Sequence, residues 1–153
     1  MTDSISKKIN GVLSGGSKQN AIAFVKFLDE NGYDYDWPSD GSGCGVNKAG
    51  KNIAYLMIDD AENMPGPWTC WFNSCEFDES GAVDDTLKET AWRHASVCGH
   101  FESGGKACGC GDQPGFTRKI FGKEFKNRCH SPLMFVDPDQ KTLGEMTRLM
   151  QLL

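Results

Sequence analysis

The sequence lacks a long hydrophobic run, since no apolar stretch approaches the roughly 20 residues that a helix needs to cross a bilayer. The N-terminal residues Met1 to Lys8 also lack the apolar stretch of a signal peptide. We therefore expect a cytoplasmic protein with no membrane partner. An excess of basic charge is missing as well, because the net charge is −5. That charge disfavours a protein that simply coats nucleic acid.

Several catalytic signatures are also missing. The chain has no His-Glu-x-x-His, and no His-x-Glu combined with Pro-Cys-x-x-Cys, so the zinc hydrolase and deaminase patterns are not found. The segments Gly104 to Lys106 and Gly111 to Gly115 are not phosphate loops, because no Gly-x-x-x-x-Gly-Lys-Ser/Thr follows a strand. No internal repeat is visible. These observations favour a binding domain over an enzyme.

The composition is that of one folded domain over residues 1–153. Hydrophobic residues make up 39% and charged residues 24% of the chain, and nine Phe and four Trp exclude a disordered protein. A length of 153 residues is enough to bury a single core. The charges are uneven, with an acidic run from Asp29 to Asp40 and a basic run from Phe116 to His130. Such runs are usually solvated surfaces.

Helical spacing of apolar residues predicts four helices. They cover Ser4 to Leu13, Ser17 (as N-cap) to about Asn31, Asp84 or Asp85 to about Val97, and a last helix that starts at Asp137-Pro138. Alternation and aromatic content predict a hairpin of residues 45–47 and 52–58, then strands over 68–74 and 133–136. Strands grouped in the middle, with N- and C-terminal helices outside, predict an α+β fold with a small antiparallel sheet.

The cysteines provide the strongest functional signal. There are seven, an odd number, and four of them, with all three histidines, lie between positions 94 and 130. The region 98–130 reads as an irregular loop that has no hydrophobic periodicity of its own over 99–115. Thiolate and imidazole are ligands that zinc prefers, and a structural site needs four of them. A bound metal would also staple a glycine-rich loop that has no core.

We expect the zinc ligands to be Cys98, Cys108, Cys110 and Cys129. The spacing is irregular, because Cys108-Gly-Cys110 is a Cys-x-Cys and the other two are distant singles. Two alternatives stay open, namely ordinary thiols in a glycine-rich loop and a redox or disulfide pair. His94 lies one helical turn before Cys98 and could replace a cysteine. His100 and His130 are weaker candidates, and all three histidines are left out of the predicted set.

The remaining cysteines and aromatic residues suggest weaker sites. Cys70 is expected in the core, whereas Cys44 could be exposed but has no identifiable base beside it. The aromatic residues from Tyr33 to Trp37, with Tyr55, Trp68 and Trp71, could line an apolar cleft for a small ligand. The basic residues from Arg118 to Arg128, with Phe116, Phe121 and Phe125 between them, make nucleic acid a possible but not favoured partner.

Most of the chain resembles a group of small uncharacterised bacterial proteins. The resemblance rests on the stretch Ile120-Phe-Gly-Lys-Glu-Phe125, on Cys129, and on Phe135-Val-Asp-Pro-Asp139. Upstream it includes Phe27-Leu-x-x-x-Gly-x-x-Tyr-x-Trp37 and Gly45-Val-x-x-x-Gly-Lys-Asn-Ile53. In that group the cysteines lie closer together, as Cys-x-x-Cys-Gly-x-x-Cys. The order of elements more distantly resembles YdhG-like domains of unknown function. These likenesses imply a fold and bring no activity.

The sequence therefore predicts a zinc-binding module whose metal is structural and which binds a small ligand or a macromolecular partner. The alternative is a thiol- or metal-dependent enzyme acting on a small molecule. A closed four-cysteine site would favour the module, and an open coordination position or a thiol of strongly lowered pKa would favour the enzyme.

Overall fold

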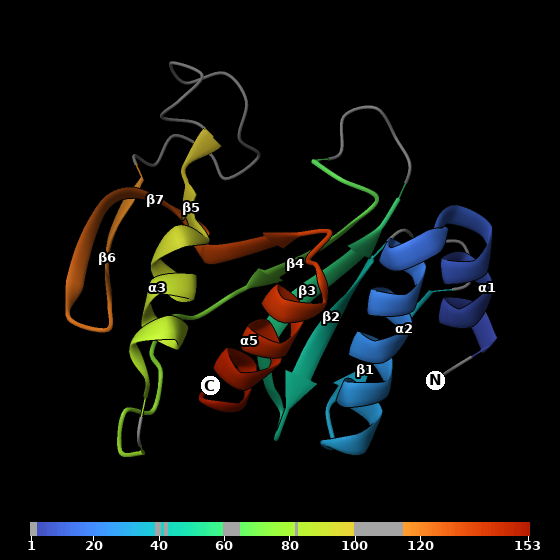
Figure 1. Ribbon diagram of the computed structural model, residues 1–153, viewed down its shortest axis with the longest axis horizontal. Helices are drawn as coiled ribbons and strands as arrows, with labels where there is room; N and C mark the ends of the chain where they lie inside the picture. The colour runs from blue at the N-terminus through green and yellow to red at the C-terminus, as the bar shows by residue number, and fades with distance from the viewer. Residues whose placement is uncertain (1–2, 39–40, 42, 60–64, 82, 100–114) are drawn as a thin grey trace.

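The computed structural model describes residues 3–38, 41, 43–59, 65–81, 83–99 and 115–153 (Figure 1). The described helices are α1 (Asp3–Val12), α2 (Gly15–Glu30), α3 (Asp85–Arg93) and α5 (Gln140–Gln151). The described strands are β1 (Asp34–Tyr35), β2 (Gly43–Lys48), β3 (Lys51–Ile58), β4 (Trp68–Phe72), β5 (Ala95–Val97), β6 (Phe116–Ile120) and β7 (Lys123–Val136).

All seven described strands belong to one sheet in the order β1-β2-β3-β4-β7-β5, and β6 pairs with the first part of β7. Every pairing is antiparallel. The predicted α+β class, with a small antiparallel sheet and terminal helices, is confirmed. The predicted metal-stapled loop over Gly99 to Gly115 lies almost wholly outside the described residues.

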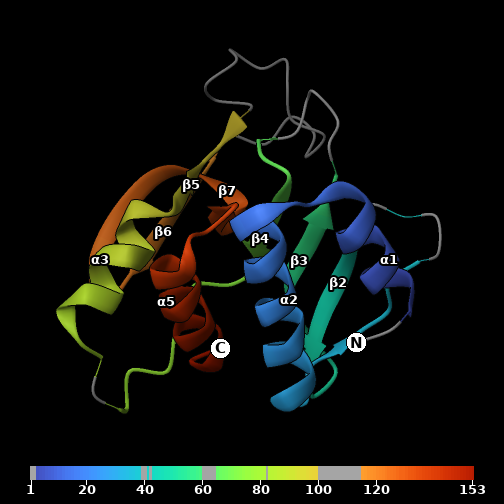
Figure 2. The same ribbon diagram turned by 45° about the vertical axis from the view of Figure 1, so that its right-hand side comes forward.

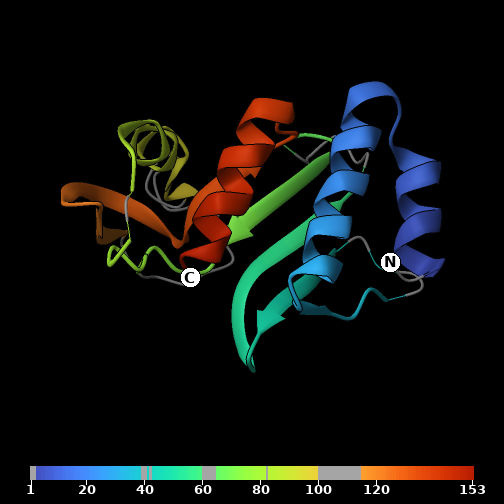
Figure 3. The same ribbon diagram turned by 60° about the horizontal axis from the view of Figure 1, so that its bottom comes forward.

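The helices cover one face of the sheet (Figure 3). Alternation along the strands sends the cross-strand pairs Ala54–Phe72, Leu56–Cys70 and Ile58–Trp68 to this face, where all six residues are buried. Apolar residues of α1, α2 and α5 complete the core (Ile5, Ile9, Phe24, Val25, Leu28, Met146, Leu149, Met150). The pair Tyr55–Trp71 points to the opposite face and is less buried.

Helices α2 and α5 lie beside each other (Figure 2), although more than 100 residues separate them in the sequence. Ser17 does not cap α2 as predicted: Ser14 occupies the N-cap position, and the Ser17 hydroxyl donates to Asp137 Oδ2 at 2.8 Å. Asp137 thus accepts from Ser17 and is not the N-cap of α5. Asp139 caps α5 instead, by accepting from the Thr142 N–H at 2.7 Å. The predicted helices are confirmed, and the N-caps of α2 and α5 are shifted by three and two residues from the predicted ones.

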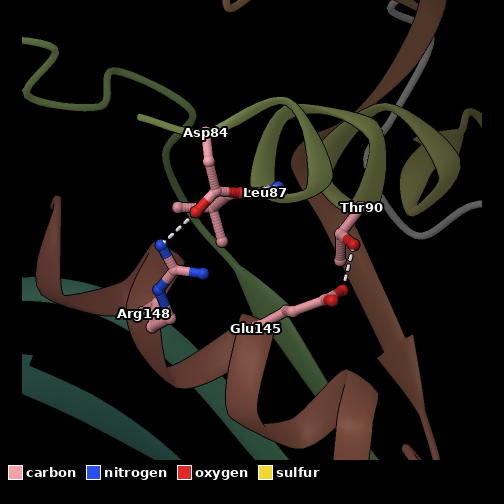
Figure 4. Close-up of polar contacts among 5 residues, drawn as sticks. All are labelled: Asp84, Leu87, Thr90, Glu145 and Arg148. Atoms are coloured by element: carbon pink, nitrogen blue, oxygen red, sulfur yellow. Dashed lines mark hydrogen bonds and ion pairs between the residues drawn. The ribbon is translucent and has the colours of Figure 1, made fainter. Parts of the chain in front are cut away.

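Helix α3 ends at Arg93, four residues before the predicted end, and Ala95–Val97 form strand β5 instead. The helix stops at His94 because the chain pairs with β7 from Ala95 onward. The Met134 N–H donates to the His94 carbonyl at 3.0 Å. Two polar links fix α3 on α5 (Figure 4). Asp84 caps α3 and accepts from Arg148 at 2.5 Å, and Thr90 donates to Glu145.

Residues 116–136 form a hairpin where the sequence predicted mainly irregular structure followed by a strand over 133–136. Strand β6 and the first part of β7 meet at the two-residue turn Phe121-Gly122, where both residues have positive φ (46° and 77°). The hairpin between β2 and β3 uses the same device at Ala49-Gly50 (50° and 76°). Such turns match the twist of paired strands. The irregular loop predicted over 98–130 is therefore wrong for its described part from residue 116 onward.

Candidate functional site

Two of the four predicted metal ligands, Cys98 and Cys129, lie on adjacent strands. Val97 of β5 pairs with Arg128 of β7, and the Cys98 N–H donates to the Asn127 carbonyl at 2.8 Å. Cys98 follows one member of this pair and Cys129 follows the other, on the side where the register between β5 and β7 is irregular. The fold thus places two cysteines that are 31 positions apart in the sequence next to the same strand pair.

Gly115 lies against the same strands. A Cβ placed on Gly115 would be 2.7 Å from Asn127 Cα and 3.0 Å from Cys98 Cβ, so the contact accepts only glycine without a shift of backbone. The next residue, Phe116, pairs with Arg128. Gly115 and Phe116 therefore lie on the sheet beside Cys98.

The other two predicted ligands, Cys108 and Cys110, lie outside the described residues, as does His100. Within the described ranges there is no group of three or more His, Cys, Asp or Glu side chains that could hold a metal ion. Cys98 and Cys129 would thus need ligands from residues 100–114 to complete a tetrahedral site.

His94 and His130 have other contacts. The His94 ring stacks on Phe135, with centroids 4.4 Å apart, and its Nδ1 lies 3.2 Å from the Met134 carbonyl oxygen. Burial lowers the pKa of His94 below 6.5, so the neutral ring is favoured. His130 is exposed, and its ring meets the edge of Phe116.

The three remaining cysteines sit in less reactive surroundings. Cys70 is fully buried in β4, which confirms its predicted place in the core. Cys44, which the sequence left open as an exposed thiol, is also buried. Burial, together with the negative charge of Asp36, raises its pKa to about 11. Burial raises the pKa of Cys70 and of the half-buried Cys75 as well. A nucleophilic thiol needs the opposite shift.

The sheet face opposite the helices carries an apolar pocket of about 390 Å³. Its walls are Tyr55, Met57, Trp71, Asn73, Cys129 and Ser131. The Tyr55 ring lies over the strand β2 backbone at Gly43, where an added Cβ would come within 2.8 Å of the ring. The expectation that Tyr55 and Trp71 line a cleft is thus confirmed, whereas Tyr33, Trp37 and Trp68 are core residues.

A second pocket, of about 540 Å³, adjoins the first and shares Asn73 with it. It is lined by Lys51, Asn52, Asn73, Ser74, Cys75, Glu76, Thr117, Arg118 and Lys119. Three of these residues are basic and one is acidic. We call the two pockets the aromatic pocket and the basic pocket.

The sequence analysis missed the basic pocket because its residues come from three distant segments. In the sequence, Arg118 and Lys119 are visible only as part of a basic run, and no pattern marks Asn73. The one signal in the sequence is the alternation of Arg118 and Ile120 with Thr117 and Lys119, as in a strand. The hairpin that contains this strand is hard to recognise because a phenylalanine occupies its turn.

Comparisons with known proteins give no family assignment. No protein-family model, no curated protein and no solved structure matched the chain. Among the described residues, no helix combines the length and the apolarity needed to span a membrane.

Proposed function

We propose that this protein is a zinc-binding α+β module, in which Cys98, Cys108, Cys110 and Cys129 hold a structural zinc ion and the helix-free face of the sheet binds a small ligand or a macromolecular partner. The zinc would join residues 100–114 to the sheet. The chemistry that it supplies is thiolate coordination that stabilises the fold, with no open position for a substrate.

One observation carries the proposal: Cys98 and Cys129 each directly follow a member of the Val97–Arg128 pair that joins β5 to β7. The Cys98 N–H bonds to Asn127, and Gly115 packs against both of these residues. The segment that carries Cys108 and Cys110 therefore begins and ends beside this strand pair. Tethering raises the effective concentration of the missing ligands.

Cysteine variants test the ligand set. We expect Cys108→Ser and Cys129→Ser to lose zinc and to unfold at lower temperature, because a structural zinc contributes directly to the folding free energy. Cys75→Ser is the matched control, since Cys75 is a half-buried thiol on the neighbouring surface and not a proposed ligand. Zinc content would be measured by mass spectrometry after gel filtration. Equal zinc in all three variants would contradict the ligand assignment.

The second candidate is a metal-dependent enzyme, and one observation favours it. Cys129 is both a proposed zinc ligand and part of the wall of the aromatic pocket, so a metal on Cys129 would border a ligand pocket. Cobalt in place of zinc distinguishes the two functions. A closed four-thiolate site keeps its visible spectrum when azide is added, whereas an open catalytic site changes.

A further inference from the structure

We propose that the aromatic and basic pockets together form one binding site for a small anionic ligand that carries a planar ring, of the class of nucleoside monophosphates. This inference deepens the proposed function by naming the ligand class, and it does not require zinc to be bound. The argument rests on three features: exposed aromatic rings, unpaired cations beside them, and a fixed polar bridge between the two.

The aromatic pocket presents two rings that do not cover each other. The Tyr55 and Trp71 centroids are 6.4 Å apart and their planes are inclined by 48°, so each ring keeps a face available. Tyr55 is 38% exposed, and among the large hydrophobic side chains of the described ranges only Val97, at 42%, is more exposed. Met57 adds a flexible apolar wall. Stacking of a base on such a ring contributes about 1–3 kcal/mol.

The basic pocket holds cations without acidic partners. No carboxylate forms an ion pair with Lys51, Arg118 or Lys119 anywhere in the described ranges, and Glu76 is the single acidic residue in the wall. The net charge of the protein is −5, so this local cluster of positive charge is opposite in sign to the molecule as a whole. Unpaired cations that converge on one hollow favour an anionic ligand.

Arg118 is the best-placed of these cations. Its guanidinium stacks over the Phe116 ring at 4.7 Å from the centroid, and its Nη2 donates to the His130 carbonyl at 3.2 Å. These contacts hold the guanidinium in one orientation, while its buried Nε has no hydrogen-bond partner. Because Nε is closed to solvent, an anion in the basic pocket would contact the outer nitrogens of the guanidinium.

Asn73 joins the two pockets and is held rigidly. Its backbone N–H donates to the Ile53 carbonyl at 2.8 Å, its Nδ2 donates to Asn52, and its Oδ1 accepts from the Ser131 hydroxyl at 2.9 Å. A ring in the aromatic pocket and an anion in the basic pocket would thus lie on either side of one fixed amide. A mononucleotide has this arrangement of ring and anion, and the pocket volumes suit a single small molecule.

The test is isothermal titration calorimetry of the purified full chain with the 5′-monophosphates of adenosine, guanosine, cytidine and uridine. The four parent nucleosides, inorganic phosphate and a single-stranded RNA oligomer serve as comparisons. We expect at least one monophosphate to bind, and to bind more tightly than its nucleoside and than phosphate. Trp71→Ala and Arg118→Gln should each weaken that binding about tenfold or more.

Three controls keep the test specific. Trp71→Phe should restore most of the affinity lost in Trp71→Ala, because it keeps a stacking ring. Lys26→Gln removes one positive charge from the exposed surface of α2 and should bind as the unaltered protein does. Zinc content measured on every variant separates this inference from the metal: nucleotide binding without zinc would uphold the site and contradict the metal proposal.

Three results would overturn the inference. They are the absence of binding by all four monophosphates, binding that Trp71→Ala and Arg118→Gln leave unchanged, and tight binding of the RNA oligomer with none of the mononucleotides. The last result would identify the face as a nucleic-acid interface.

Discussion

Burial decides the chemistry of individual thiols in this protein. The pKa of Cys44 is raised to about 11 by burial and by Asp36, and those of Cys70 and Cys75 are raised by burial. With a pKa of about 11, only about one thousandth of the Cys44 thiol is ionised at about pH 8. A cysteine at any of these positions would therefore be a weak nucleophile. This disfavours a thiol-dependent enzyme that uses Cys44, Cys70 or Cys75.

Thiol labelling checks this directly. In the folded protein we expect Cys44 and Cys70 to resist iodoacetamide at about pH 8, because both are buried and protonated, and to react fully after unfolding. Peptide mass spectrometry would report the labelled positions. Rapid labelling of Cys44 in the folded state would contradict its placement in the core.

His94 gives a pH-dependent contribution to stability. Burial lowers its pKa in the folded state below the ordinary 6.5, so between these two values the unfolded chain binds more protons. The contribution of His94 to the free energy of unfolding is therefore complete above pH 6.5 and is lost as the pH falls from 6.5 through the lower folded pKa.

Urea unfolding at several pH values between about 5 and 8 measures this effect. We expect His94→Gln to flatten the decline in stability below pH 6.5, while it lowers stability at all pH values through the lost stacking on Phe135. His130→Gln, at an exposed position, is the control and should leave the slope unchanged. An unaltered slope in His94→Gln would show that His94 is not the group responsible.

At the scale of elements, Asp84 couples the start of α3 to α5 (Figure 4). Its Oδ1 accepts from the Leu87 N–H at 2.8 Å and its Oδ2 accepts from Arg148 at 2.5 Å. The hydrogen bond from Arg148 and the helix N–H groups hold the pKa of Asp84 below the usual 3.8. Its contribution is thus present above pH 3.8 and is lost as the pH falls below that value.

Replacing Asp84 by Ala should lower the melting temperature more than replacing Arg148 by Ala, because Asp84 serves both as cap and as ion-pair partner. Differential scanning calorimetry of the two variants and of the double variant checks this. We expect the double variant to lose less stability than the sum of the losses in the two single variants. The reason is that each single variant already removes the same ion pair. Exact additivity would contradict the coupling between α3 and α5.

The elements that the sequence predicted well are those whose signal is local. Apolar residues at helical spacing, such as Phe24, Val25 and Leu28, identified the helices, and the β2–β3 hairpin was marked by a glycine turn. The β6–β7 hairpin was missed because its turn begins with Phe121, a residue that disfavours positive φ. Stacking of Phe121 on Phe77, with centroids 4.8 Å apart, makes that conformation tolerable, and no local pattern reveals it.

The same reasoning applies to the candidate site. The clustering of cysteines in the sequence predicted the candidate ligands, and the structure adds that Cys98 and Cys129 follow the two members of one strand pair. The start of β5 was hidden because α3 has a helical pattern that continues beyond Arg93, and the pairing of β5 with β7 overrides that local preference.

At the scale of the whole molecule, the sheet has two unlike faces. One face is filled by the helices and forms the core, and the other carries the aromatic and basic pockets between the two ends of the sheet. The proposed zinc would lie where Cys129 borders the aromatic pocket. Loss of metal is therefore expected to weaken ligand binding only indirectly, by changing the wall that Cys129 provides.

The central claim is that thiolates from Cys98, Cys108, Cys110 and Cys129 bind zinc. Its most direct test is the metal content of the purified, untagged protein by mass spectrometry, combined with a thiol count in denaturant with and without a chelator. The account predicts about one zinc per chain, with four thiols protected until the chelator is added. A metal-free protein with all seven thiols reactive under both conditions would contradict it.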